Sequence, residues 1–137
     1  TAIRVFDPEV RLDYVFNYGT FVVDEGFYVR FVKGRMDYRL GVERFGRFQN
    51  LYLRQGRALH EQVLNLGPED VKAMAEYLEW NAQPKNATYA YDFFRDNCAT
   101  KVITVLEEVF GDRYHAGCVA TDSTYLEALR PFTAGNP

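Results

Sequence analysis

Cys98 is the side chain in this sequence that is best placed to act as a nucleophile. It follows Asp96 and Asn97, both of which cap helix N-termini well, and it precedes apolar residues at three- and four-residue spacings: Val102, Ile103, Leu106, Val109 and Phe110. We expect the thiol in the first helical turn, where unpaired N–H groups and the helix dipole favour a thiolate. The alternative is a small buried hydrophobic residue, and the neighbouring Asp96 carboxylate opposes thiolate formation.

A thiol nucleophile needs a base within hydrogen-bond reach and a third group that orients the base. The sequence has two histidines. We expect His60 on a strand face and His115 in the loop after the Cys98 helix, about a helix length from the thiol. Each is more easily explained as an ordinary surface or packing histidine, so neither is a convincing base.

The histidines and the two cysteines, Cys98 and Cys118, lack the spacing of a zinc site. We therefore predict no metal and no cofactor. A disulfide between the two cysteines would need the chain to double back along the Cys98 helix.

Composition predicts one globular domain over residues 1–137, with 131–137 as a tail. The chain is 47% hydrophobic and 26% charged, and it is rich in rings, with 11 Phe and 10 Tyr. No apolar run approaches the length of about 18 residues that a membrane span requires. No signal peptide is recognisable, which decides nothing for a mature or trimmed exported domain. The net charge of −3 argues against nucleic-acid binding.

The segments around Cys98 are predicted to be strands and helices that do not alternate regularly along the chain, which indicates an α+β fold. Residues 1–6 and 12–17 predict a hairpin that brings Thr1 close to Asn17, and Gly19 is expected to break the second strand. Further strands are expected over 20–23, 36–42 and 58–66, and an extended aromatic run precedes the Cys98 helix. Other helices are expected over 27–33, 45–56, 68–78 and 123–129.

Basic residues concentrate in the middle of the chain. Eight lie between Arg30 and Arg57 against two acidic residues, whereas the remainder has 8 basic and 17 acidic residues. Because Phe and Tyr are interleaved with them, they could contact anionic lipid headgroups or an anionic substrate. Arg39, Arg44 and Arg47 are the candidate substrate-binding residues, and the alternative is a solvated face with scattered arginines.

Several ordered motifs resemble the bacterial family called Lnb N-terminal periplasmic domain. They span about residues 1–110: Phe16-Asn-Tyr-Gly-Thr-Phe, F-x-x-x-F-x-x-G-x-x-x-Y over 27–38, Gln62-Val-Leu-Asn-Leu, and Asn86-x-x-Tyr-x-Tyr-Asp-Phe-Phe-x-Asp-Asn-Cys-Ala-Thr. The resemblance implies the circularly permuted branch of the NlpC-type papain-like superfamily, whose members include peptidoglycan amidases, lipid acyltransferases and thioesterases. It therefore implies an antiparallel sheet packed against several helices, in the periplasm or cell envelope of a Gram-negative bacterium.

The same resemblance assigns roles to individual residues. Cys98 matches the presumed nucleophile in Asp-Asn-Cys. Family members carry a Gly-His pair directly before a strand like Thr1-Ala-Ile-Arg-Val, and that histidine, the presumed base, is not within these residues. Asn17 would face the strand position next to it and is the candidate third residue of a Cys-His-Asn set, the alternative being an Asn that starts a turn at Tyr18-Gly19.

The oxyanion is expected to be held by the N–H of Cys98 and one further donor, and the candidates for the cleft are Tyr89, Tyr91, Gln62 and Asn97. The sequence thus predicts a papain-like cysteine hydrolase or acyltransferase that acts through an acyl-enzyme. Its substrate would be a lipid or peptidoglycan fragment with an amide or ester bond, and an anionic membrane surface is a further expected partner. The alternatives are a non-catalytic binding or scaffold domain with Cys98 packed in the core, and a piece of a larger envelope protein.

Overall fold

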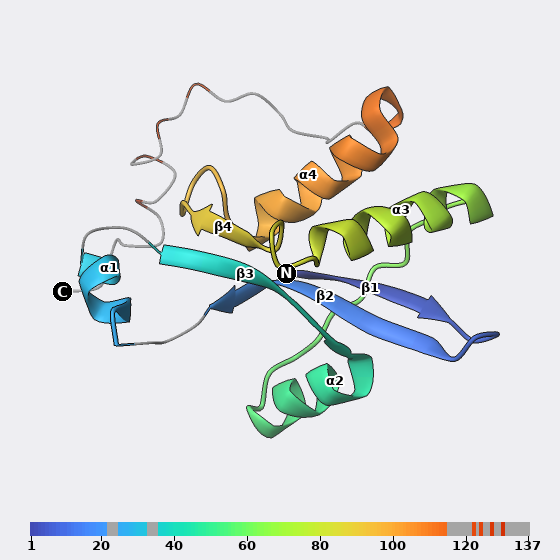
Figure 1. Cartoon of the computed structure of the whole chain (residues 1–137), viewed down its shortest axis with the longest axis horizontal. Coiled ribbons are helices and arrows are strands. Elements are labelled where there is room, and N and C mark those ends of the chain that lie inside the picture. Colours follow the sequence, from blue (N-terminus) through green and yellow to red (C-terminus); the bar gives the residue numbers. More distant parts are fainter. Residues whose placement is uncertain are drawn as a thin grey trace.

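The computed structural model describes residues 1–21, 25–32 and 36–114, together with Asp122, Thr124, Glu127 and Arg130. This part of the chain is α+β, with helices packed around a four-stranded antiparallel sheet of strand order β1-β2-β3-β4 (Figure 1). The strands are β1 (Ala2–Asp7), β2 (Leu12–Phe21), β3 (Met36–Arg44) and β4 (Thr88–Tyr91). The helices are α1 (Phe27–Val32), α2 (Phe45–Arg54), α3 (Pro68–Asn81) and α4 (Cys98–Phe110), followed by a 3₁₀ turn, Gly111–Arg113. Within the described residues, no helix is long and apolar enough to cross a membrane.

The predicted N-terminal hairpin is confirmed, and its register is set by the turn at Asp7. The Asp7 carboxylate accepts the N–H of Glu9 at 2.9 Å, and β1 then pairs with β2 so that Ala2 lies opposite Asn17. The expectation that Gly19 breaks the strand is wrong, because β2 continues to Phe21. The pairing of β2 with β3 instead shifts its register between Asn17 and Thr20, and the strand continues.

The main hydrophobic core lies between the sheet and the helices α3 and α4. It contains Phe16, Tyr18, Leu40, Met74, Leu78, Ala87 and Val105. Helix α2 lies on the other side of the sheet (Figure 1). Val15, which alternates with Phe16 along β2, and Phe48 of α2 are buried outside this cluster.

Most of the predicted elements are confirmed within a few residues, including the helices from Phe27, Phe45 and Pro68, the strand from Met36 and the extended run before Cys98. The predicted strand over 58–66 is wrong, because residues 57–67 form no regular element. Their apolar alternation has no neighbouring strand to pair with, and Val63 is 88% exposed. The ion pair between Arg4 and Glu61, at 2.9 Å, ties this segment to β1. Of the predicted helix over 123–129, only Thr124 and Glu127 are among the described residues, and Glu127 is helical. The end of the predicted helix over 27–33 and residues 22–23 of the short strand lie outside the described residues.

Candidate functional site

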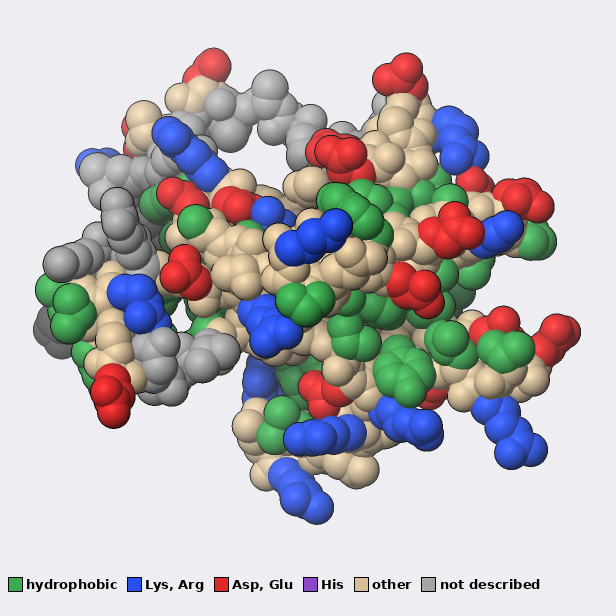
Figure 2. Space-filling view, in the orientation of Figure 1, with side chains coloured by type: hydrophobic (Ala, Val, Ile, Leu, Met, Phe, Trp, Pro, Cys, Tyr) green, Lys and Arg blue, Asp and Glu red, His purple; other side chains and the backbone are tan. Residues whose placement is uncertain are grey.

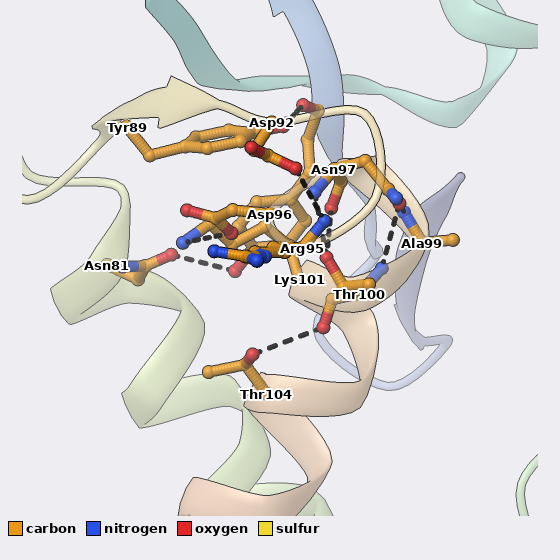
Figure 3. A network of polar contacts seen from close by, with 11 residues as sticks. Asn81, Tyr89, Asp92, Arg95, Asp96, Asn97, Ala99, Thr100, Lys101 and Thr104 are labelled. Carbon is orange, nitrogen blue, oxygen red and sulfur yellow. Dashed lines mark hydrogen bonds and ion pairs between the residues drawn. The ribbon is translucent and has the colours of Figure 1, made fainter. Parts of the chain in front are cut away.

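Cys98 is the first residue of α4, as the sequence predicted, and Asn97 is the cap. The Asn97 Oδ1 accepts the N–H groups of Ala99 and Thr100 at 2.8 and 3.1 Å, and the Thr100 hydroxyl accepts the N–H of Asn97 at 2.8 Å (Figure 3). The Asn97 Nδ2 donates to the carbonyl of Phe93 at 2.9 Å. Both ends of the Asn97 amide therefore hold the start of α4, which fixes the thiol in space instead of offering a donor to a substrate.

The cap leaves one N–H of the first turn without a partner. Within the described residues, the N–H of Cys98 meets no hydrogen-bond acceptor, whereas the next two N–H groups are taken by Asn97. An unpaired N–H at a helix start is a suitable donor to an oxyanion on the carbon that the adjacent thiol attacks. Cys98 itself is half-buried and packs against the edge of the main core.

Strand β2 approaches the thiol at Gly19. A Cβ built on Gly19 would lie 3.9 Å from the Cβ of Cys98 and 3.2 Å from the Oδ1 of Asn17. The Asn17 Oδ1 also accepts the N–H of Gly19 at 2.9 Å. The structure therefore brings Asn17, Gly19 and Cys98 together. It also shows the local hydrogen bond expected if Asn17 has a turn-forming role, so both interpretations of Asn17 have a geometric basis.

Three tyrosines form an aromatic wall beside the thiol. Tyr38 stacks on Tyr91 with ring centroids 4.3 Å apart, and Tyr89 lies 6.0 Å from Tyr38. Burial raises the pKa of the Tyr38 and Tyr89 hydroxyls, with smaller contributions from Tyr91 to Tyr38 and from Cys98 to both. These two phenols therefore lie near Cys98. Tyr38 was not among the predicted site residues, although it ends one of the motifs that carry the family resemblance.

The Tyr89 hydroxyl is already engaged. It donates to the main-chain carbonyl of Tyr18 at 2.5 Å, one residue before Gly19. Tyr18 in turn donates its own hydroxyl to Asn81 Oδ1 on α3, at 2.7 Å. This hydrogen bond links β4 to β2 beside Gly19, so the Tyr89 hydroxyl is not a free donor to a substrate. Within the described residues, the Tyr91 hydroxyl has no hydrogen-bond partner.

Lys101 is the charged residue of the site that sequence reasoning missed. It lies three residues after Cys98, and therefore on the same side of α4. Its Nζ is 2.9 Å from the Oδ1 of Asp96 and 4.6 Å from the centre of the Tyr89 ring, and only 23% of its side chain is exposed (Figure 3). The i, i+3 spacing from the thiol was the signal that could have identified it. The ammonium group of Lys101 therefore compensates the negative charge of Asp96 beside the start of α4.

Other predicted site residues are not brought to the thiol. Gln62 is exposed in the irregular segment 57–67, as is His60. Arg39 follows Tyr38 on β3 and so faces the other side of the sheet. Arg44 ends β3 six residues beyond Tyr38, which at about 3.3 Å per residue is roughly 20 Å away. Arg47 lies on α2 with its side chain 86% exposed.

The remaining predictions for this region concern metals and a disulfide. Among the described residues there is no group of three or more His, Cys, Asp or Glu side chains that could hold a metal ion. His115 and Cys118 lie outside the described residues, so the disulfide and the second histidine stay predictions.

Comparison with known proteins gives one match. The family model described as Lnb N-terminal periplasmic domain matches residues 1–126, which confirms the resemblance carried by the sequence motifs. No curated protein and no solved structure matches the chain significantly.

Proposed function

The chain belongs to the Lnb N-terminal periplasmic domain family and is thus a domain of the periplasm, and from this premise we propose that it is a cysteine hydrolase or acyltransferase of papain-like type. Its substrate in this proposal is a cell-envelope lipid or peptidoglycan fragment with an amide or ester bond. The observation that supports the proposal is the close approach of Gly19 to both Asn17 and Cys98, because a Cβ built on Gly19 would lie 3.2 Å from the Oδ1 of Asn17 and 3.9 Å from the Cβ of Cys98.

The proposed reaction follows from these positions. A base takes the proton of the Cys98 thiol, the sulfur attacks the carbonyl carbon, and the N–H of Cys98 stabilises the negative charge that forms on the carbonyl oxygen. The C–N or C–O bond then breaks, the leaving amine or alcohol takes a proton from the base, and a thioester remains on Cys98. Water resolves the thioester in a hydrolase, whereas an amine or hydroxyl acceptor resolves it in an acyltransferase.

The register of β1 against β2 supports a position for the base in this proposal. Ala2 lies opposite Asn17, so two further steps of the same antiparallel pairing put the residue immediately before Thr1 opposite Gly19. A histidine there would meet the thiol across Gly19. Asn17 would be its diagonal neighbour on β2, at a distance that two such side chains can span. This arrangement matches the Gly-His pair that the family resemblance implies before the first strand.

A non-catalytic binding or scaffold domain is the second candidate function. It is favoured by the packing of Cys98 against the main core and by the engagement of Asn17 Oδ1 with the N–H of Gly19. Both features would serve a structural thiol equally well. The two candidates differ in what a base at the predicted position does to the thiol.

The test compares two forms of the chain, extended before Thr1 by Gly-His or by Gly-Ala, in a Cys118→Ser background that leaves one thiol. We expect iodoacetamide to label Cys98 at least about tenfold faster at pH 7 in the Gly-His form, because the base draws off the thiol proton. We also expect a p-nitrophenyl ester to leave an acyl group on Cys98, detected by mass spectrometry and lost in Cys98→Ser. Equal labelling of both forms with no acyl adduct would favour the non-catalytic domain.

A further inference from the structure

The stretch from Arg44 to Arg57 has a charge opposite to that of the rest of the protein. It holds four arginines and no acidic residue, whereas the other residues of the chain include 12 basic and 19 acidic ones. Helix α2 (Phe45–Arg54) makes up most of this stretch, and Arg44 and Arg57 lie at its two ends. Figure 2 shows Lys and Arg side chains gathered over the part of the surface where Figure 1 places α2. The structure therefore separates a cationic surface from the thiol site, although the sequence suggested that the arginines line the cleft.

The cationic groups follow one side of the helix. Arg47 and Arg54 are seven residues apart, so they point the same way two turns from each other. Between them, Asn50 and Leu51 line a shallow groove of about 590 Å³ that also includes Glu43. The side chain of Arg47 is 86% exposed.

These positive charges are largely uncompensated. Within the described residues, these four arginines form one ion pair, between Arg47 and the carboxylate of Glu43 at 3.6 Å. Arg57 lies over the ring of Tyr52 at 4.1 Å, and Arg44 over that of Tyr14 at 5.8 Å. Aromatic faces hold a guanidinium group in place without cancelling its charge.

Exposed leucines lie among the arginines. Leu51 and Leu53 are 48% and 65% exposed, while Phe48, one turn before Leu51, is buried against the protein. The helix is therefore anchored by its own apolar face and still offers apolar side chains to the outside. Arginines next to exposed leucines, on a helix lying flat against the protein, are typical of surfaces that bind anionic bilayers.

We propose that this surface, comprising Arg44, Arg47, Leu51, Leu53, Arg54 and Arg57, docks the domain on a bilayer that contains anionic phospholipids. The charge is complementary to lipid phosphates, the leucines suit the interface beneath the headgroups, and a periplasmic domain has membranes within reach. The proposal goes beyond the thiol chemistry and does not depend on it, because the surface contains no residue of the Cys98 site.

The test is co-sedimentation of the protein with vesicles of phosphatidylglycerol and phosphatidylethanolamine, compared with vesicles of phosphatidylcholine. We expect binding to the anionic vesicles that weakens at high salt. The Arg47→Gln/Arg54→Gln variant should bind about 25-fold less tightly, which corresponds to about 1 kcal/mol for each arginine. Labelling of Cys98 should be unchanged in this variant, so a failure here and a failure of the proposed enzyme activity are distinguishable.

The matched control is Lys72→Gln/Lys85→Gln, which removes the same charge from exposed residues of α3 and of the loop after it. This control should bind vesicles within about twofold of the unchanged protein, and circular dichroism should show that both variants are folded. Equal loss of binding in the two variants would overturn the proposal, since net charge alone would then explain it. Binding to immobilised polyglutamate but not to vesicles would also overturn it, in favour of an acidic protein partner.

Discussion

The two sides of the sheet differ in how firmly they fix their side chains. On the side of α3 and α4, seven buried residues form one core, and the Asn97 cap and the Tyr89 hydroxyl lock the chain around Cys98. On the side of α2, Val15 and Phe48 are buried outside that core, and the outer surface is a set of exposed arginines. The difference suits the two proposals, because thiol chemistry would need precisely placed side chains, whereas attraction to a charged surface would not.

The largest effect that tests this contrast is on stability. Leu78 of α3 is fully buried, so Leu78→Ala should lower the free energy of unfolding by about 3 kcal/mol through lost contacts and the cavity left behind. Leu53→Ala on α2, where the side chain is 65% exposed, is the matched control and should change it by less than about 0.5 kcal/mol. Urea unfolding measures both. Similar losses in the two variants would mean that the sides do not differ in this way.

A smaller effect is expected from the hydroxyl of Tyr89. Tyr89→Phe removes the hydrogen bond to the carbonyl of Tyr18, which should cost about 1 kcal/mol of unfolding free energy at neutral pH. It should also change the rate at which Cys98 is labelled, because β4 is no longer linked to β2 beside Gly19. Tyr28→Phe, where the ring is 72% exposed, is the control and should alter neither quantity.

The same hydroxyl predicts how stability depends on pH. Burial raises the pKa of Tyr89 above its ordinary value of 10.0, so the unfolded chain loses this proton first. The contribution of Tyr89 to stability is therefore fully present below about pH 10 and declines as the pH rises above it. Thermal unfolding measured from pH 8 to 11 should show a shallower decline in Tyr89→Phe than in the unchanged protein. Parallel curves for the two would contradict the raised pKa.

The smallest effects are expected from replacing two glycines, Gly46 on α2 and Gly19 beside Cys98. A Cβ on Gly46 of α2 meets nothing within 4 Å, so Gly46→Ala should stabilise the protein by about 0.5–1 kcal/mol and leave thiol labelling unchanged. Gly19→Ala adds a methyl group between Asn17 and Cys98 and should slow labelling severalfold. Iodoacetamide kinetics and urea unfolding on both variants test the pair. Faster or unchanged labelling in Gly19→Ala would mean that this contact does not shape the thiol site.

The sequence was sufficient to predict elements whose signals are local. The apolar spacing after Cys98 and the capping residue Asn97 predicted α4, Pro68 predicted the start of α3, and Asp7-Pro8 predicted the hairpin. These signals depend on short-range periodicity and turn chemistry, and the structure keeps them all. The predicted strand over 58–66 failed because its alternation had the right period but no neighbouring strand, which only tertiary structure can supply.

The candidate site also combines local features, which the sequence predicts, with long-range features, which it does not. The position of Cys98 at a helix start was readable, since it depends on a few consecutive residues. The hydrogen bond from the Tyr89 hydroxyl to the carbonyl of Tyr18 could not be predicted, because it joins residues 71 apart in the sequence. The distribution of the arginines was also unreadable, since which side of a sheet a basic helix covers depends on the path of the whole chain.

The contact between Gly19 and Cys98 has a consequence for the order of folding. The β1–β2 hairpin forms between near neighbours, whereas this contact closes a loop of almost eighty residues and depends on the pairing of β3 with β4. Contacts between distant residues are slow to form because the entropy of loop closure must be met first. The thiol of Cys98 therefore gains its surroundings late in folding. Until then, after export to the periplasm, it is open to oxidants and to other thiols.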